Sequence, residues 1–305
     1  MYQSGYFPSV LIPVLSDMYG VPEDQILLSY GSEELLRTAF DSLDPRRDLV
    51  LTHKYHYSYY QKYLDFKHVR LTYFDMHVRH RSFLFDIDDC IAQLERIVPA
   101  ILLLTSPNNP TGNSIGPADI VRIMDHVRPD TLVIIDQAYI EFELGVGTAG
   151  YADLLSRYPN LMMLRSFSKL YALAGLRIAY ALCGVAVKEM LRYQNRYLGM
   201  SRLIEEVSIA ALKSRAYYEG VRADIINHRE QFLLATSKLR RFTVYDSQAS
   251  FVLAKIDPMV RQAFNAALDA EPVIIGKYVD VNMYRISLGW QKDSERLISI
   301  MNILD

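Results

Sequence analysis

Short apolar segments alternate with longer amphipathic segments from the N-terminal region to about Ala186. The apolar segments predict strands at residues 26–29, 49–52, 69–73, 101–105, 132–136, 161–165 and 178–182. The amphipathic segments predict helices at residues 33–41, 57–65, 88–96 and 117–127. Several predicted strands are apolar throughout, which is typical of strands covered by helices on both faces. The alternation therefore predicts an α/β fold with a mainly parallel central sheet.

After about Ala186 the pattern changes to long helical segments, followed by strands predicted at 250–255 and 284–288. This change predicts a second, smaller α+β domain. Residues 26–190 would form the large domain, and residues 1–25 together with 191–305 the small one. The length of 305 residues agrees with two domains of about 150 residues each.

Composition and charge exclude several classes of protein. Hydrophobic residues make up 50% of the chain and charged residues 22%, as in folded globular proteins. Lys and Arg number 33 against 35 for Asp and Glu, without a basic stripe, so we expect no nucleic-acid partner. No apolar run reaches the roughly 18 residues of a membrane span, and no secretory leader is evident. Two cysteines, Cys90 and Cys183, predict no disulfide framework, and we expect a cytoplasmic protein.

Lys169 is the first candidate for chemistry. It follows a predicted buried strand and precedes a loop that ends at Arg177. A lysine beside Ser166 and Ser168, with an arginine further on, can bind a phosphate while it offers an amine. The alternative is an ordinary solvated lysine, because most lysines are exposed.

Asp136 is the second candidate, since it ends an apolar strand. In open α/β sheets the carboxyl ends of the strands face the ligand crevice. A carboxylate there can meet a cationic or protonatable ring nitrogen. The alternative is an aspartate that caps a helix or a turn.

Two further segments adjoin predicted strands. Residues 105–112, Thr-Ser-Pro-Asn-Asn-Pro-Thr-Gly, form a rigid loop after a strand, although the composition alone indicates only a turn. Gly31 and Ser32 open an amphipathic helix, whose first N–H groups can bind an anion. The alternative for Ser32 is a simple helix cap.

Together, these segments resemble the fold-type-I enzymes that use pyridoxal 5′-phosphate (PLP), and in particular the class I/II aminotransferases. The histidinol-phosphate aminotransferase branch is the most similar, with its patterns SPNNPTG, DEAYIEF and SKAFALAGLR. Here the corresponding segments are SPNNPTG at 106–112, DQAYIEF at 136–142 and SKLYALAGLR at 168–177. The resemblance extends from about Tyr6 to the C-terminus and implies the type I PLP-dependent transferase fold.

The resemblance implies roles for residues at the reacting end of the cofactor. Lys169 would form a Schiff base with the cofactor aldehyde and later move protons. Asp136 would pair with the pyridine nitrogen and keep it protonated. Tyr139 and Asn109 would hydrogen-bond the 3′ oxygen. Arg285, with Asn109 nearby, would bind the α-carboxylate of the substrate.

The resemblance also implies a phosphate site and a stacking ring. Three side chains and two backbone N–H groups would bind the phosphate, namely those of Ser166, Ser168 and Arg177, and of Ser32 and Glu33. Tyr57 would stack on the cofactor ring, with Tyr59 and Tyr60 as alternatives within the tyrosine-rich segment 55–60. No metal site is expected.

The sequence departs from the family pattern in three places. Family members usually begin with an arm of some tens of residues before the first helix, and this sequence starts at or just before that helix. Gln137 stands where glutamate is common. The arginine that helps to bind the phosphate of histidinol phosphate is missing from residues 273–278, where Lys277 offers only a point charge. Histidinol phosphate is therefore weakly supported as the substrate.

The leading hypothesis is a PLP-dependent aminotransferase that exchanges an amino group between an amino acid, or a similar amine, and a 2-oxo acid. One alternative is a PLP-dependent decarboxylase of an amino-acid phosphate, because motifs that bind the cofactor do not reveal which bond breaks. Another is a PLP-binding protein without catalytic activity. The resemblance also implies a homodimer.

Overall fold

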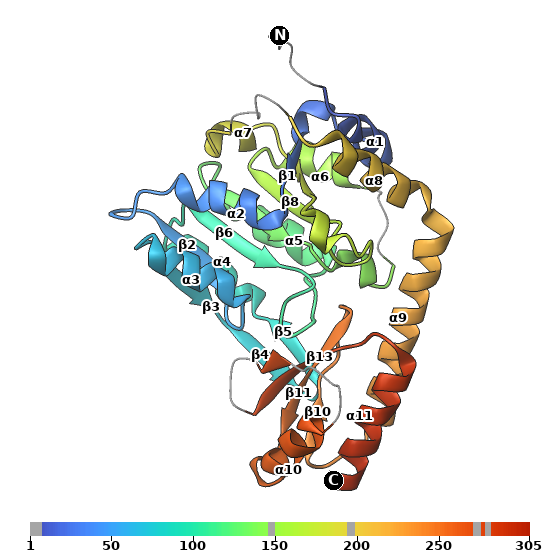
Figure 1. The fold of residues 1–305 in the computed structure, drawn as a ribbon. Coiled ribbons are helices and arrows are strands. Elements are labelled where there is room, and N and C mark those ends of the chain that lie inside the picture. Colours follow the sequence, from blue (N-terminus) through green and yellow to red (C-terminus); the bar gives the residue numbers. More distant parts are fainter. Residues whose placement is uncertain (1–7, 146–149, 194–198, 271–275, 278–281) are drawn as a thin grey trace.

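The large sheet has seven strands in a computed structural model that describes residues 8–145, 150–193, 199–270, 276–277 and 282–305. In order across the sheet they are β1 (Ile26–Ser29), β9 (Ala179–Cys183), β8 (Leu161–Ser166), β7 (Leu132–Asp136), β6 (Ile101–Thr105), β2 (Leu49–His53) and β3 (Arg70–Phe74). β8, β7, β6, β2 and β3 are parallel, and β9 runs antiparallel to both of its neighbours. The predicted mainly parallel sheet is confirmed (Figure 1).

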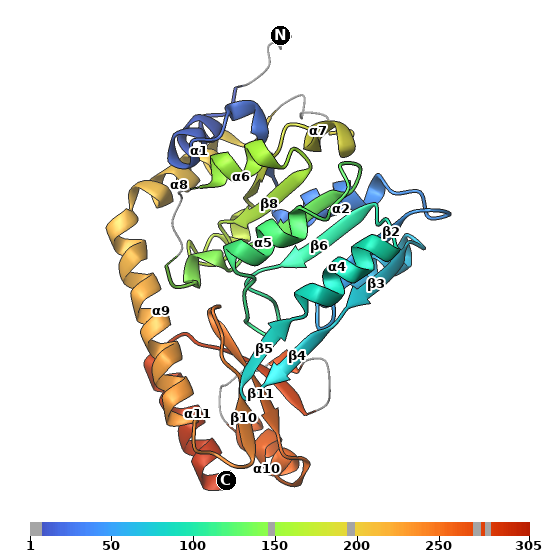
Figure 2. The same cartoon turned by 180° about the vertical axis from the view of Figure 1, so that it is seen from behind.

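Helices cover both faces of this sheet, as the apolar strands predicted (Figures 1 and 2). One face carries α2 (Ser32–Asp41), α3 (Ser58–Phe66) and α7 (Val187–Met190). The other carries α1 (Leu11–Tyr19), α4 (Ile87–Arg96), α5 (Pro117–Met124), α6 (Tyr151–Arg157) and α8 (Arg202–Lys213). Within β6, Leu102 and Leu104 pack into one core and Ile101 and Leu103 into the other, because side chains alternate along a strand.

The second sheet is antiparallel and has four strands. Their order is β10 (Phe242–Val244), β11 (Phe251–Ile256), β13 (Met283–Ser287) and β12 (Gly276–Lys277). α10 (Pro258–Asp269) and α11 (Gln291–Leu304) pack against it. The long helix α9 (Arg215–Ala235) runs from the level of the large sheet to the small one (Figure 1).

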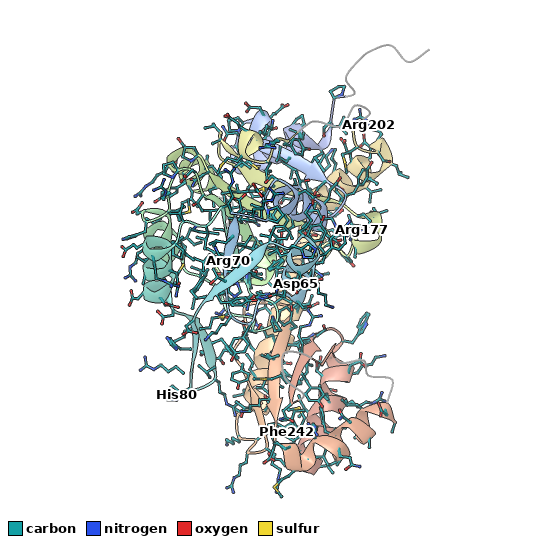
Figure 3. The ribbon with its side chains drawn as sticks, turned by 90° about the vertical axis from the view of Figure 1, so that its left-hand side faces the viewer. Asp65, Arg70, His80, Arg177, Arg202 and Phe242 are labelled. Carbon is teal, nitrogen blue, oxygen red and sulfur yellow. The ribbon has the colours of Figure 1, made fainter. Side chains whose placement is uncertain are left out.

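A hairpin that the sequence pattern did not predict lies between the two sheets. It consists of β4 (Met76–Arg79) and β5 (Ser82–Phe85). Its apolar residues Met76 and Phe83 pack against Tyr245 and Leu253 of the small-sheet region. Figure 3 shows the hairpin, with His80 in its turn, extending towards the sheet that carries Phe242.

The N-terminal helix is fixed to the large sheet. Leu11 and Leu15 of α1 lie in the same core as the large sheet. Glu205 of α8 accepts hydrogen bonds from the N–H groups of Val10 (2.6 Å) and Leu11 (3.1 Å), which caps the start of α1. The predicted division into residues 26–190, and 1–25 with 191–305, stays a prediction, although this packing ties α1 to the large sheet.

Short 3₁₀ turns complete the connections, at η1 (Glu23–Gln25), η2 (Ile140–Phe142) and η3 (Ala174–Leu176). Among the helices in the described ranges, we find none long and apolar enough to span a membrane.

Candidate active site

The carboxyl ends of β6, β7 and β8 meet the first turn of α2 at one edge of the large sheet, and a cavity of about 310 Å³ lies there. Every residue that the sequence singled out for the site lines this cavity: Ser32, Glu33, Tyr57, Asn109, Asp136, Tyr139, Ser166, Ser168, Lys169, Arg177 and Arg285. Residues from distant parts of the chain therefore come together as predicted. Their individual roles stay predictions.

Asp136, the last residue of β7, is buried at the base of the cavity. Its Oδ2 accepts a hydrogen bond from the Tyr60 hydroxyl (2.8 Å), and its Oδ1 accepts one from the Ala138 N–H (3.1 Å). Burial raises the pKa of Asp136, while these two donors and the positive charge of Lys169 act in the opposite direction. A carboxylate in this setting favours a cationic or protonated partner.

Lys169 lies in the turn that follows β8. Its Nζ is 5.1 Å from the centre of the Tyr139 ring, a distance suited to a cation–π contact. The amine and the Asp136 carboxylate thus face the same small cavity.

Arg285 reaches the cavity from β13 of the small sheet. Its Nη1 donates to Asn109 Oδ1 (3.2 Å) and to the Tyr139 hydroxyl (3.4 Å). Asn109 belongs to the loop after β6, in which the Ser106–Pro107 and Asn109–Pro110 peptide bonds are cis. The cavity is therefore built from both sheets, and Arg285 places a positive charge on its small-sheet side.

Another part of the cavity lining has the features of an anion site. Gly31 precedes α2 with φ +85°, and no side chain caps the helix, so the first-turn N–H groups at Ser32 and Glu33 are left for other acceptors. A Cβ on Gly31 would lie 2.2 Å from Arg177 Nη2, so the glycine lets the guanidinium approach the helix start. On the far side, Ser166 Oγ accepts the N–H of Ser168 (3.0 Å).

The three tyrosines proposed for stacking differ in their surroundings. Tyr60 is fully buried, and its hydroxyl is bound to Asp136. The Tyr59 hydroxyl accepts a hydrogen bond from Arg37 Nε (2.9 Å). Tyr57 is 36% exposed, lines the cavity and packs edge-on against Tyr60 at 5.6 Å. Tyr59 and Tyr60 line the cavity as well, so the stacking role of Tyr57 stays a prediction.

Sequence reasoning missed part of the lining. Thr105, Ala138, Ala174 and Leu36 also line the cavity. Tyr60 was considered only for stacking, and its bond to Asp136 was not predicted. The one available signal was its spacing, since Tyr60 lies three residues after Tyr57, which is the N-cap of α3.

Gln137 does not line the cavity. Its Oε1 accepts a hydrogen bond from Nε of the buried Arg165 (3.0 Å). Arg165 Nη1 lies 3.8 Å from Glu141 Oε1, and burial raises the pKa of Glu141 to about 7. The residue in the usual place of glutamate thus orients a buried arginine behind the site.

Lys277 cannot be placed in this site. Its backbone forms part of β12, but its side chain and residues 271–275 and 278–281 lie outside the described part of the chain.

Comparisons with known proteins agree with this arrangement. The family model for aminotransferase class I and II matches residues 15–300. Histidinol-phosphate aminotransferase 2 of Archaeoglobus fulgidus is 29% identical over 293 residues, which cover 94% of this chain and 80% of that protein. The structure of histidinol-phosphate aminotransferase from Sinorhizobium meliloti with pyridoxal 5′-phosphate has a TM-score of 0.82 at 22% identity, and the match covers 97% and 82% of the two chains. L-threonine-O-3-phosphate decarboxylase from Porphyromonas gingivalis has a TM-score of 0.79 at 19% identity, with 97% and 88% covered.

The chain belongs to the class I and II aminotransferases. It has the type I fold of PLP-dependent enzymes and is a PLP-dependent aminotransferase. The cavity fits this cofactor because it brings together the Asp136 carboxylate, the Lys169 amine and a positively charged site for an anion at Arg177. Because Gly31 has no side chain, the Arg177 guanidinium can lie close to the start of α2. The guanidinium and the backbone N–H groups there can then bind the same phosphate.

Proposed function

We propose that this enzyme moves an amino group from an amino acid or a similar amine to a 2-oxo acid, with Lys169 as the reacting amine. The observation that carries the proposal is that Lys169, Asp136 and Arg285 line one small cavity although they come from three different strands or turns. The names of the relatives make histidinol phosphate the first donor to test.

Each residue has a defined task in this proposal. When bound, PLP supplies an electron sink for the carbon from which a proton is removed. Lys169 Nζ would hold the cofactor through its aldehyde and would be the base that takes up and returns the proton at the substrate carbon. Asp136 holds a proton on the ring nitrogen. Tyr139 and Asn109 would hydrogen-bond the 3′ oxygen of the cofactor, and Tyr57 would stack on the cofactor ring.

Binding at the two ends of the cavity orients the reactants. The cofactor phosphate would be bound by Arg177, by the side chains of Ser166 and Ser168 and by the N–H groups in the first turn of α2. A guanidinium and helix N–H groups both favour phosphate oxygens. Arg285 binds a carboxylate of the amino acid or of the 2-oxo acid. Because Arg285 comes from the small sheet, a bound carboxylate would also connect the two sheets.

The test is a donor panel with the PLP-loaded enzyme. Histidinol phosphate, other phosphorylated amino compounds and common amino acids are each added with a labelled 2-oxo acid, and transfer of the amino group is measured. Transfer from one donor that is lost in Lys169→Ala, with the melting temperature retained, supports the proposal. Release of CO₂ without transfer would favour the decarboxylase. No response to any donor would favour the catalytically inactive PLP-binding protein. Lys62→Ala, a change at an exposed lysine of α3, is the matched control.

We also propose that the enzyme is a cytoplasmic homodimer, which the family resemblance supports. Its mass by light scattering tests this arrangement, since a monomeric mass in the PLP-loaded state would contradict it.

A further inference from the structure

Asp136 is held by a chain of hydrogen bonds that leads away from the cavity. The Tyr60 hydroxyl donates to Asp136 Oδ2 (2.8 Å) and lies 3.2 Å from Thr105 Oγ1. The Thr105 N–H in turn donates to His53 Nε2 (3.3 Å), and His53 Nδ1 lies 2.9 Å from the carbonyl oxygen of Lys54. All four linked side chains, from Asp136 to His53, are buried.

The direction of each bond follows from the number of protons available. The Tyr60 hydroxyl has one proton, which it donates to Asp136, so Thr105 must donate its own hydroxyl proton to Tyr60. Because His53 Nε2 accepts the Thr105 N–H, the ring proton must be on Nδ1, where it is donated to the Lys54 carbonyl. Burial lowers the pKa of His53 to about 3, which is consistent with a neutral ring.

This direction is the one that an ionised Asp136 imposes, because a carboxylate can only accept hydrogen bonds. Burial opposes ionisation of Asp136, and the Tyr60 hydroxyl is one of only two hydrogen-bond donors that the described residues give its carboxylate. The hydrogen bond from Tyr60 therefore stabilises the charged form of Asp136, and this charge in turn favours a protonated neighbouring base.

We propose that Tyr60 is a positioning residue that orients Asp136 and keeps it ionised, and that the Thr105 hydroxyl fixes the direction in which Tyr60 donates. The proposal rests on the proposed role of Asp136 as partner of the cofactor ring nitrogen. Tyr60 would thereby control how firmly that nitrogen remains protonated, although it carries out no proton transfer with the substrate.

Tyr60→Phe tests this proposal in the PLP-loaded enzyme. The ring is fully buried, and the substitution keeps it while removing only the hydroxyl. With PLP labelled with ¹⁵N in the ring, nuclear magnetic resonance reports the protonation of that nitrogen as the pH is raised. We expect the nitrogen to lose its proton at a lower pH than in the parent enzyme. We also expect kcat to fall about tenfold or more with little change in KM, since a hydrogen bond to a charged group contributes about 1.5–3 kcal/mol.

Two further variants complete the test. Tyr63→Phe is the matched control, because Tyr63 lies on the same helix and its hydroxyl donates to exposed Asp41 (3.0 Å) outside the cavity. It should leave both the ¹⁵N signal and kcat unchanged. Thr105→Val removes the donor to Tyr60 and should shift the ¹⁵N titration in the same direction by a smaller amount. It also provides the test if Tyr60→Phe does not fold.

Asp136→Asn distinguishes a failure of the positioning role of Tyr60 from a failure of the proposed role of Asp136. If it abolishes the protonated ¹⁵N signal while Tyr60→Phe and Thr105→Val leave the signal and kcat unchanged, the positioning role is overturned and the proposed function stands. If Asp136→Asn itself leaves the signal unchanged, the role of Asp136 is wrong, and the positioning role of Tyr60 is wrong with it.

Discussion

Replacing Gly31 with alanine should weaken cofactor binding through a collision with Arg177. Gly31 has φ +85° and ψ 154°, a conformation that is essentially restricted to glycine, so the strained backbone should cost about 1–3 kcal/mol in the free energy of unfolding. In addition, the new Cβ would lie 2.2 Å from Arg177 Nη2 and 2.8 Å from Cζ, so the guanidinium must move. Loss of one charge-assisted hydrogen bond of about 1.5–3 kcal/mol predicts PLP binding weaker by about 10- to 100-fold.

The assay is a PLP titration monitored by visible absorption, with thermal melting of the same samples. Gly150→Ala is the control for backbone strain, because Gly150 has φ +84° and its added Cβ would meet no atom of the described residues within 4 Å. It should lower stability and leave PLP affinity unchanged. Arg177→Ala should weaken binding by itself, and adding Gly31→Ala to it should have little further effect, since the collision partner is gone. Equal PLP affinity in Gly31→Ala and the parent, or full additivity with Arg177→Ala, would refute this reasoning.

Three other predictions follow from the site and its surroundings. Arg285→Lys keeps the charge but loses the bidentate geometry of a guanidinium, so KM for the 2-oxo acid should rise about tenfold or more. An unchanged KM would rule out a carboxylate contact. Tyr57→Phe should retain PLP affinity while Tyr57→Ala weakens it several-fold to about tenfold, as measured by titration; equal affinities would show that Tyr57 does not stack. Burial raises the pKa of Glu141 from 4.5 to about 7, so the folded state retains a proton that the unfolded state has lost, and stability should fall by up to about 3 kcal/mol as the pH rises from about 4.5 to 7. Denaturant unfolding at about pH 5 and about pH 8 should show this fall in the parent and not in Glu141→Gln, and identical pH dependence would contradict it.

The sequence predicted the large sheet well because its strands are apolar over their whole length. The strands predicted at 101–105 and 132–136 are present with those bounds as β6 and β7, and the others agree to within one residue at each end. The helix predicted at 117–127 ends at Met124, because the apolar pattern continues into the turn that follows. The hairpin at Met76–Phe85 was not predicted. It contains His77, Arg79 and other polar residues, and part of its apolar side is buried against Tyr245 and Leu253, which are distant in the sequence.

The site was predictable where position along a strand determines position in space. Asp136 ends a strand, and Asn109 and Lys169 follow strands, whose carboxyl ends meet at one edge, so their convergence follows from topology. The contact between Tyr60 and Asp136 depends instead on how α3 packs over the sheet. Likewise, no sequence pattern indicates that Gln137 would bind Arg165 rather than face the cavity.

Lys169 is proposed as the amine that binds the cofactor, and chemical reduction tests this assignment directly. The PLP-loaded enzyme is treated with borohydride, digested and examined by mass spectrometry, so that the residue bound to the cofactor is identified directly. We expect the reduced cofactor on Lys169 and none on the corresponding peptide of Lys169→Ala. Label on another lysine, or no label on an enzyme that catalyses amino transfer, would contradict it.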